Sequence, residues 1–260
     1  MDVVEAKPQE IGGSTAEGGK YTRLTATLLI PSLNERDGLE AILPKIDPRW
    51  VDDILFVDGG SIDGSQEVIR RWGHGRLLMQ KEPRLCSAYW ESLAVISSDI
   101  VVTFSPDGNS LPEAIPALLS KIREGYDMVI ASRYLPGAGS QDDGPITAFG
   151  NWMFTRVINL LFGGQYTDAL VILRAYRTKQ IRELGMETGA GDFEPLLSIR
   201  CGVYRKRVTA IPAKEPRRIG GKRKMRILHD GWVIVVLIAR EWVRVRRLRK
   251  HLKEGLWPSN

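Results

Sequence analysis

The stretch Ile100–Glu113, IVVTFSPDGNSLPE, decides the predicted fold, because an apolar run leads directly into a polar turn. Residues 100–104 have the length and β-branched composition of a buried strand. Asp107 and Asn109 follow in the turn, and 111–113 are typical of a helix start, where Pro112 costs little because the first N–H groups of a helix lack intrahelical partners. Asp-Gly and Asn are ordinary turn residues when taken alone. Their significance therefore depends on which other residues gather beside them.

Similar apolar runs recur along the first half of the chain, and a segment of helical length separates each from the next. Strands that alternate with helices indicate parallel βαβ units with right-handed crossovers. We therefore predict an α/β fold with a mostly parallel sheet. The expected strands are 26–30, 54–57, 77–79, 100–104 and 128–131, and the expected helices are 39–46, 65–72, 87–96 and 111–124.

Polar loops follow the predicted strands, and ligands of open parallel sheets bind beyond the carboxyl ends of the strands. These loops carry acidic, amide, glycine and arginine residues, which should converge on one edge. Asp107 and Asn109 offer the hard oxygen ligands that Mg²⁺ or Mn²⁺ takes when it bridges to a diphosphate. Arg133 can balance phosphate charge. Asp63 is expected to cap the helix that follows it. The loops are 31–36, 58–65, 105–109 and 132–134.

Composition and missing motifs exclude several classes of protein. The chain has 260 residues, of which 43% are hydrophobic and 26% charged, as suits one large globular domain. It contains neither GxGxxG nor GxxxxGK[ST], so dinucleotide and P-loop sites lose their main support. Cys86 and Cys201 have no CxxC spacing, which argues against a disulfide framework or zinc site and fits a reducing compartment. The net charge of +6 comes without interleaved aromatics, so we expect no nucleic-acid partner.

The two ends of the chain differ in character from its middle. Residues 1–22 are rich in Gly and Glu without a secretory signal, which predicts a disordered tail before a domain at 23–225. In 226–260, apolar residues at helical spacing adjoin a basic side, as in an interfacial helix on an anionic membrane surface. A packing helix with a solvated basic face, or a buried strand at VIVVLI, stays open. Residues 152–162 are a second membrane-facing candidate, and no run reaches the roughly 20 residues of a spanning helix.

Six short motifs in order resemble those of glycosyltransferase family 2, the inverting GT-A fold, and within it the dolichyl- or polyprenyl-phosphate sugar synthases. The likeness covers about 25–225. The motifs are PSLNE, VDGGSIDGS, SPDGNSLPE, ASRY, TDALVILRAYR and IPAKEPRRIGGKRKM.

The resemblance implies a UDP- or GDP-linked sugar donor, a lipid phosphate acceptor and a divalent cation. Pro31, Glu35 and Asp58 would line the pocket for the nucleotide base and ribose. Asp107 and Asn109 would approach the Mg²⁺ or Mn²⁺ ion. The cations implied near the donor diphosphate or the acceptor phosphate are Arg133, Arg174, Arg218 and Lys224.

Several positions depart from the family pattern. Ser105 stands in place of the first Asp of D-x-D, so the cation site should be weaker or depend more on the donor's phosphates. Val171-Ile172 replace a Ser-Gly pair, and Arg223 replaces a Ser. The segment RLCSAYWES also lacks the usual glycines. These departures suggest that acceptor or sugar specificity differs from that of typical dolichyl-phosphate mannose synthases.

The nature of the acceptor decides which catalytic groups are needed. A lipid phosphate is already ionised, so Asp107 with its metal and Arg133 would suffice, and the enzyme would be cytoplasmic and peripherally attached to a membrane. A soluble or glycan hydroxyl acceptor needs a base, for which Asp192 and Glu194 are the candidates. Either direct displacement inverts the anomeric centre. A non-catalytic protein that binds nucleotide sugars is a third alternative, because Ser105 removes a metal ligand.

Overall fold

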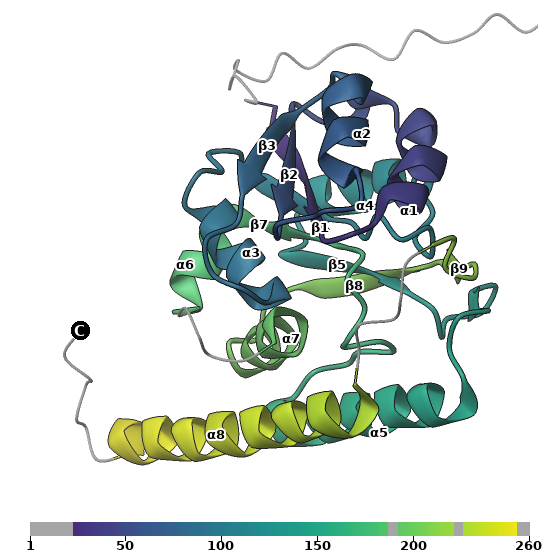
Figure 1. Cartoon of the computed structure of the whole chain (residues 1–260). Coiled ribbons are helices and arrows are strands. Elements are labelled where there is room, and N and C mark those ends of the chain that lie inside the picture. The colour runs from purple at the N-terminus through teal and green to yellow at the C-terminus, as the bar shows by residue number, and fades with distance from the viewer. Residues whose placement is uncertain (1–22, 187–191, 221–225, 254–260) are drawn as a thin grey trace, which may run out of the picture.

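A seven-stranded sheet forms the centre of the protein in the computed structural model (Figure 1). The structure describes residues 23–186, 192–220 and 226–253, so the expected tail at 1–22 and the candidate Lys224 lie outside the described residues. The strand order is β3-β2-β1-β4-β7-β5-β8, and β7 alone in this sheet runs antiparallel to its neighbours. The strands are β1 Ala26–Ser32, β2 Asp53–Asp58, β3 Arg76–Met79, β4 Ile100–Thr103, β5 Met128–Ser132, β7 Arg174–Arg177 and β8 Val208–Pro212.

The order of the strands reverses between β1 and β4. The chain runs outward from β1 through β2 to β3 and then returns to place β4 on the other side of β1. Such a reversal opens a crevice at the carboxyl ends of the two strands, which is where open α/β sheets bind ligands. A ligand site is therefore expected at the loops after β1 and β4.

Helices cover both faces of the sheet, whose central strands are buried on both sides. Apolar residues of α1, α2 and α4 pack on one face, and those of α3 and α7 pack on the other. Helices α5 and α8 lie side by side as an outer layer beyond α7 (Figure 1). Their bounds are α1 Arg36–Ile42, α2 Ser65–Trp72, α3 Leu85–Leu93, α4 Ala114–Arg123, α5 Pro145–Phe162, α6 Thr178–Glu183, α7 Phe193–Val203 and α8 Ile227–Lys253.

The outer helix α8 is docked onto the body of the protein. Its Leu237 and Val245 are buried in the core cluster that also contains α5 and α7. Glu241 accepts from Arg200 of α7 at 3.0 and 3.2 Å, and both side chains are buried. Within the described residues, no helix has both the length and the apolar character to cross a membrane.

Small elements complete the chain. The two-stranded sheet of β6 (Gly139–Ser140) and β9 (Lys214–Glu215) lies apart from the main sheet, and two 3₁₀ turns, η1 Leu43–Lys45 and η2 Pro48–Trp50, follow α1.

Some expected boundaries were wrong, and four strands were not predicted. The first helix begins at Arg36 rather than 39, and Pro44 turns its end into the 3₁₀ turn η1. The fourth helix begins at Ala114, because Leu111 first closes a turn by accepting from the Ala114 N–H at 3.2 Å. The VIVVLI segment is helical within α8, which excludes the strand alternative. The unpredicted strands are β7 and β8 of the main sheet and the two short strands β6 and β9.

Candidate active site

The loops after β1 and β2 are bound to each other by polar side chains. Asn34, at φ +51°, accepts from the Ile62 N–H at 2.9 Å, and its own N–H donates to Ser61 Oγ at 2.8 Å. Asp63 accepts from the N–H groups of Arg36 and Ser65 at 3.0 Å, so it caps the starts of α1 and α2 together. Burial raises the pKa of Asp63, but these bonds and the Ser65 hydroxyl outweigh it and leave the pKa lowered. Asp63 thus binds the start of the helix that follows it, as expected, although Gly64 holds the N-cap position of α2.

Asp58 ends β2 and is fully buried beneath its loop. Its carboxylate accepts from the N–H groups of Gly60 and Ser61 at 3.0 and 2.8 Å, from Ser61 Oγ at 2.6 Å and from Gln66 Nε2 at 2.9 Å. Pro31 lies next to the end of β1, opposite Val57. Asp58 therefore shapes the loop, and contact of either residue with a nucleotide stays a prediction.

Asp107 lies in a tight turn after β4 and is 4% exposed. Its Oδ1 accepts from the Asn109 N–H at 3.2 Å, and Gly108 between them takes φ +85°, which favours glycine. Helix α1 approaches this turn closely, since a Cβ on Gly38 would lie 2.2 Å from the Pro106 carbonyl oxygen. The turn is thus packed against the first turn of α1, at the crevice where the strand order reverses.

Glu35 and Asp107, here called the acidic pair, are brought together at this crevice by Arg218. The Arg218 Nη1 lies 3.2 Å from Glu35 Oε1, and Nη2 lies 2.5 Å from Asp107 Oδ2. Both carboxylates are buried, and Arg218 is 21% exposed. The described residues contain no group of three or more His, Cys, Asp or Glu suited to a metal. The guanidinium nevertheless shows that the acidic pair accommodates positive charge.

Arg133 lies elsewhere, enclosed by three carboxylates. It donates to Asp168 Oδ2 at 2.7 Å, to Asp143 Oδ2 at 3.2 Å and to Glu215 Oε2 at 3.3 Å. Burial lowers the pKa of Arg133, but the carboxylates raise it well above its ordinary value. This charge is already balanced inside the protein, so the described structure argues against Arg133 as a free cation for the diphosphate. Sequence reasoning missed these partners, although Asp168 lies within the TDALVILRAYR motif.

Arg174 is the first residue of β7 and Glu194 lies in α7, and neither contacts the acidic pair in the described part of the chain. Arg174 is completely buried and donates to the carbonyl oxygens of Ala169, Val171 and Glu194 and to Ser198 Oγ. Burial lowers the pKa of Arg174 and raises that of the Glu194 carboxyl beside it. The guanidinium is satisfied by the protein itself, which argues against a phosphate contact for Arg174 in this conformation.

Asp192 precedes α7 at its N-cap position. Burial and the nearby Asp230 raise its pKa, while Arg84 and His229 lower it by a smaller amount. Neither Asp192 nor Glu194 contacts the acidic pair in the described part of the chain, so a basic role for them stays a prediction.

The model of the family "Glycosyl transferase family 2" matches residues 27–185, which include β1 to β7 and the acidic pair. The chain belongs to glycosyltransferase family 2. The match confirms the family resemblance and includes the first five of the six motifs, and the protein is a glycosyltransferase.

Curated relatives are similar over most of this chain. The Haloferax volcanii "Glycosyltransferase AglJ" is 23% identical over 82% of this chain and 70% of its own length. A dolichyl-phosphate hexose transferase of the same organism is 28% identical over 77% of this chain and 87% of its own length. An undecaprenyl-phosphate 4-deoxy-4-formamido-L-arabinose transferase of Klebsiella pneumoniae is 26% identical over 76% of this chain but only 62% of its own length.

Solved structures show the same fold at low sequence identity. Glucosyl-3-phosphoglycerate synthase from Mycobacterium tuberculosis, in complex with Mn²⁺, UDP and phosphoglyceric acid, superposes with a TM-score of 0.62 at 20% identity, covering 85% of this chain and 79% of that one. Its complex with UDP gives a TM-score of 0.65. The predicted GT-A fold is confirmed.

Proposed function

We propose that this glycosyltransferase moves a sugar from a nucleotide-sugar donor to a polyprenyl- or dolichyl-type lipid phosphate at a membrane surface. Two relatives whose names specify lipid-phosphate acceptors support the acceptor class. The crevice at the acidic pair supports a donor site, because it is the position at which open α/β sheets bind nucleotides. The observation that carries the proposal is an exposed apolar surface on the outer helix layer.

This surface, here called the apolar face, covers the outward sides of α5 and α8. Most of its members are three, four, seven or eight residues apart, which are spacings of about one or two helical turns, so they share one side of each helix. Leu160 is 84% exposed and Trp232 is 66% exposed. A monomer that stays in water rarely exposes so many large apolar side chains on one surface. They are Ile146, Phe149, Trp152 and Leu160 of α5 and Leu228, Trp232, Val235, Val236 and Val243 of α8.

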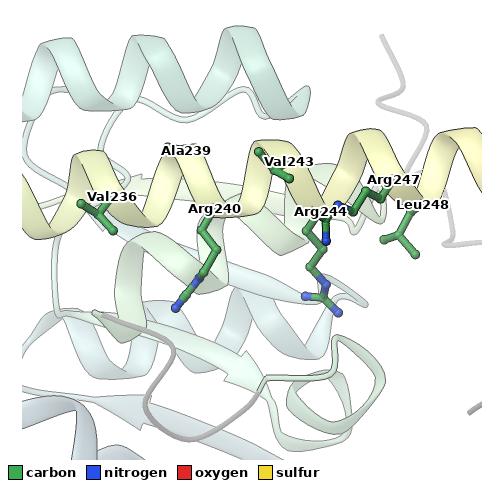
Figure 2. A pocket seen from close by; sticks show the side chains of 7 residues that line it. All are labelled: Val236, Ala239, Arg240, Val243, Arg244, Arg247 and Leu248. Carbon is green, nitrogen blue, oxygen red and sulfur yellow. The ribbon is translucent and has the colours of Figure 1, made fainter.

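Arginines adjoin the apolar face. Figure 2 shows a pocket along α8 lined by Val236, Val243 and Leu248, with Arg240 and Arg244 reaching to one side. Arg240 and Arg247 are exposed and, within the described residues, make no ion pair. Apolar side chains beside unpaired cations match the interface of an anionic bilayer. This match favours peripheral attachment, with the acceptor phosphate presented at the membrane surface.

The proposed reaction is a single displacement at the anomeric carbon. An oxygen of the lipid phosphate forms the new C–O bond, the bond to the nucleoside diphosphate breaks, and the diphosphate leaves with the bonding electron pair. The lipid phosphate is already ionised at neutral pH, so no residue needs to remove a proton. The protein's task is to hold the two phosphates in line and to stabilise the departing charge, for which Arg218 is placed at the crevice.

Asp107 and Asn109 would hold the divalent cation that several of the solved structures contain. The chemistry fits, since a carboxylate and an amide oxygen are hard ligands and Arg218 already shows positive charge accommodated there. When bound, the cation would neutralise the diphosphate. Because Ser105 replaces the first Asp of D-x-D, this site has one carboxylate fewer than the family pattern. The donor's phosphates would supply the remaining ligands of the cation.

The test is transfer of labelled sugar from a panel of UDP- and GDP-linked donors in detergent, with Mn²⁺. We expect product with undecaprenyl or dolichyl phosphate and none with the matching polyprenol, which has the same chain but no phosphate. Asp107→Asn should lower the rate at least about 100-fold, as does loss of a group that stabilises developing charge. Transfer to the polyprenol or to soluble glycans instead would contradict the proposal and favour a base such as Glu194.

A further inference from the structure

Arg218 contacts the acidic pair although it lies far from both residues in the sequence. It lies 183 residues from Glu35 and 111 residues from Asp107 in sequence, and it contacts both carboxylates with different nitrogens of one guanidinium. Pairs of a buried carboxylate with a guanidinium are strongly held when the geometry is good. The side chain therefore acts as a cross-link between the loops after β1 and β4.

The backbone beside Arg218 is fixed to the same loops. The Ile219 N–H donates to the Asp107 carbonyl oxygen at 2.9 Å. The Ile219 side chain packs over Gly108, where a Cβ would lie 2.5 Å from Ile219 Cγ1. A Cβ on Gly220 would lie 2.6 Å from that of Asp37. Residues 218–220, here called the latch segment, thus close over the crevice.

The Arg218 guanidinium contacts the same carboxylate to which a metal ion would bind. Asp107 Oδ2 is in contact with Arg218 Nη2, and Asp107 Oδ1 accepts from the Asn109 N–H. A divalent ion bound to Asp107 at about 2 Å would meet a guanidinium at the same oxygen, and two cations this close repel strongly. Arg218 and the metal ion therefore compete for Asp107.

We propose that Arg218 is a resident cation that holds the donor crevice closed, and that donor and metal open it together. On donor binding, the guanidinium exchanges the acidic pair for the diphosphate and leaves Asp107 to the metal ion. The Arg218 Nε is buried and has no acceptor among the described residues, so a phosphate oxygen would satisfy it. Metal and nucleotide then bind with positive coupling, and neither binds tightly alone. This inference rests on the proposed nucleotide-sugar donor.

The test measures Mn²⁺ affinity of the full chain without nucleotide, by the electron paramagnetic resonance signal of free Mn²⁺. Arg218→Met should bind Mn²⁺ at least about tenfold more tightly than the wild type, which corresponds to about 1.4 kcal/mol. Arg217→Met is the matched control: it removes the same charge from an exposed neighbour and should bind Mn²⁺ as the wild type does. Asp107→Asn added to Arg218→Met should abolish the gain.

Equal Mn²⁺ affinity of the wild type and Arg218→Met would overturn the inference. A second measurement needs no variant: UDP or GDP should tighten Mn²⁺ binding to the wild type at least about tenfold, and the same affinity with either nucleotide as without would also overturn it. The Mn²⁺ comparison uses neither lipid nor sugar. Failure of the transfer assay would therefore reject the proposed acceptor without affecting this result.

Discussion

At the scale of single residues, Arg133 holds three carboxylates in place near the carboxyl end of β5. Arg133→Met should reduce the free energy of unfolding at neutral pH by about 3–5 kcal/mol, because the buried Asp168 loses its counter-charge. Urea denaturation measures the change. Arg133→Lys should recover part of the loss, and Arg49→Met, which removes an exposed arginine, should leave the urea midpoint nearly unchanged.

The loss in Arg133→Met should depend on pH in a defined direction. Burial raises the pKa of Asp168, but Arg133 and its other hydrogen bonds leave the pKa lowered in the folded protein. Its stabilising contribution is therefore present above the unfolded pKa of about 3.9 and is lost as the pH falls through the folded value. In Arg133→Met, the effect of burial on Asp168 is no longer offset, so the pKa of Asp168 rises. Protonation of Asp168 then removes the unpaired buried charge and reduces the destabilisation of the variant. The stability difference should narrow as the pH falls from 7 to 5, and a constant difference would contradict this account.

At the scale of elements, the paired helices α5 and α8 are expected to bind membranes. Trp152→Ser together with Trp232→Ser should weaken co-sedimentation with phosphatidylglycerol-containing vesicles at least about tenfold, because burial of a large apolar side chain contributes about 1.5–3 kcal/mol. Ile62→Ser is the control, since Ile62 is 93% exposed, more than either tryptophan, but lies in the loop after β2. Failure of the wild type to bind such vesicles would reject the membrane role of the apolar face.

The same scale shows which elements the sequence could predict. Strands β1, β2, β4 and β5 are buried on both faces, so they read as continuous apolar runs. Strand β7, with the sequence RAYR, has no such pattern, because its Arg174 is buried and satisfied by carbonyl groups that come together only in the fold. Strand β8 is only half-buried, which weakens its periodic signal.

At the scale of the whole molecule, the site is assembled from segments far apart in the chain. The turn at Asp107 could be predicted from its place after a strand, because strand ends of parallel sheets meet at one edge. The contact of Arg218 with Glu35 could not be predicted, because the local sequence does not show which of the many basic residues lies at the crevice. The partners of Arg133 were missed for the same reason.

The central claim is that the nucleotide sugar binds at the reversal between β1 and β4, at the acidic pair. The most direct measurement is a crystal structure with UDP or GDP and Mn²⁺, using the anomalous scattering of manganese. We expect one manganese peak about 2 Å from Asp107, with the diphosphate between it and Arg218. A nucleotide bound at another surface, with Arg218 still on Asp107 and no manganese beside it, would contradict the account.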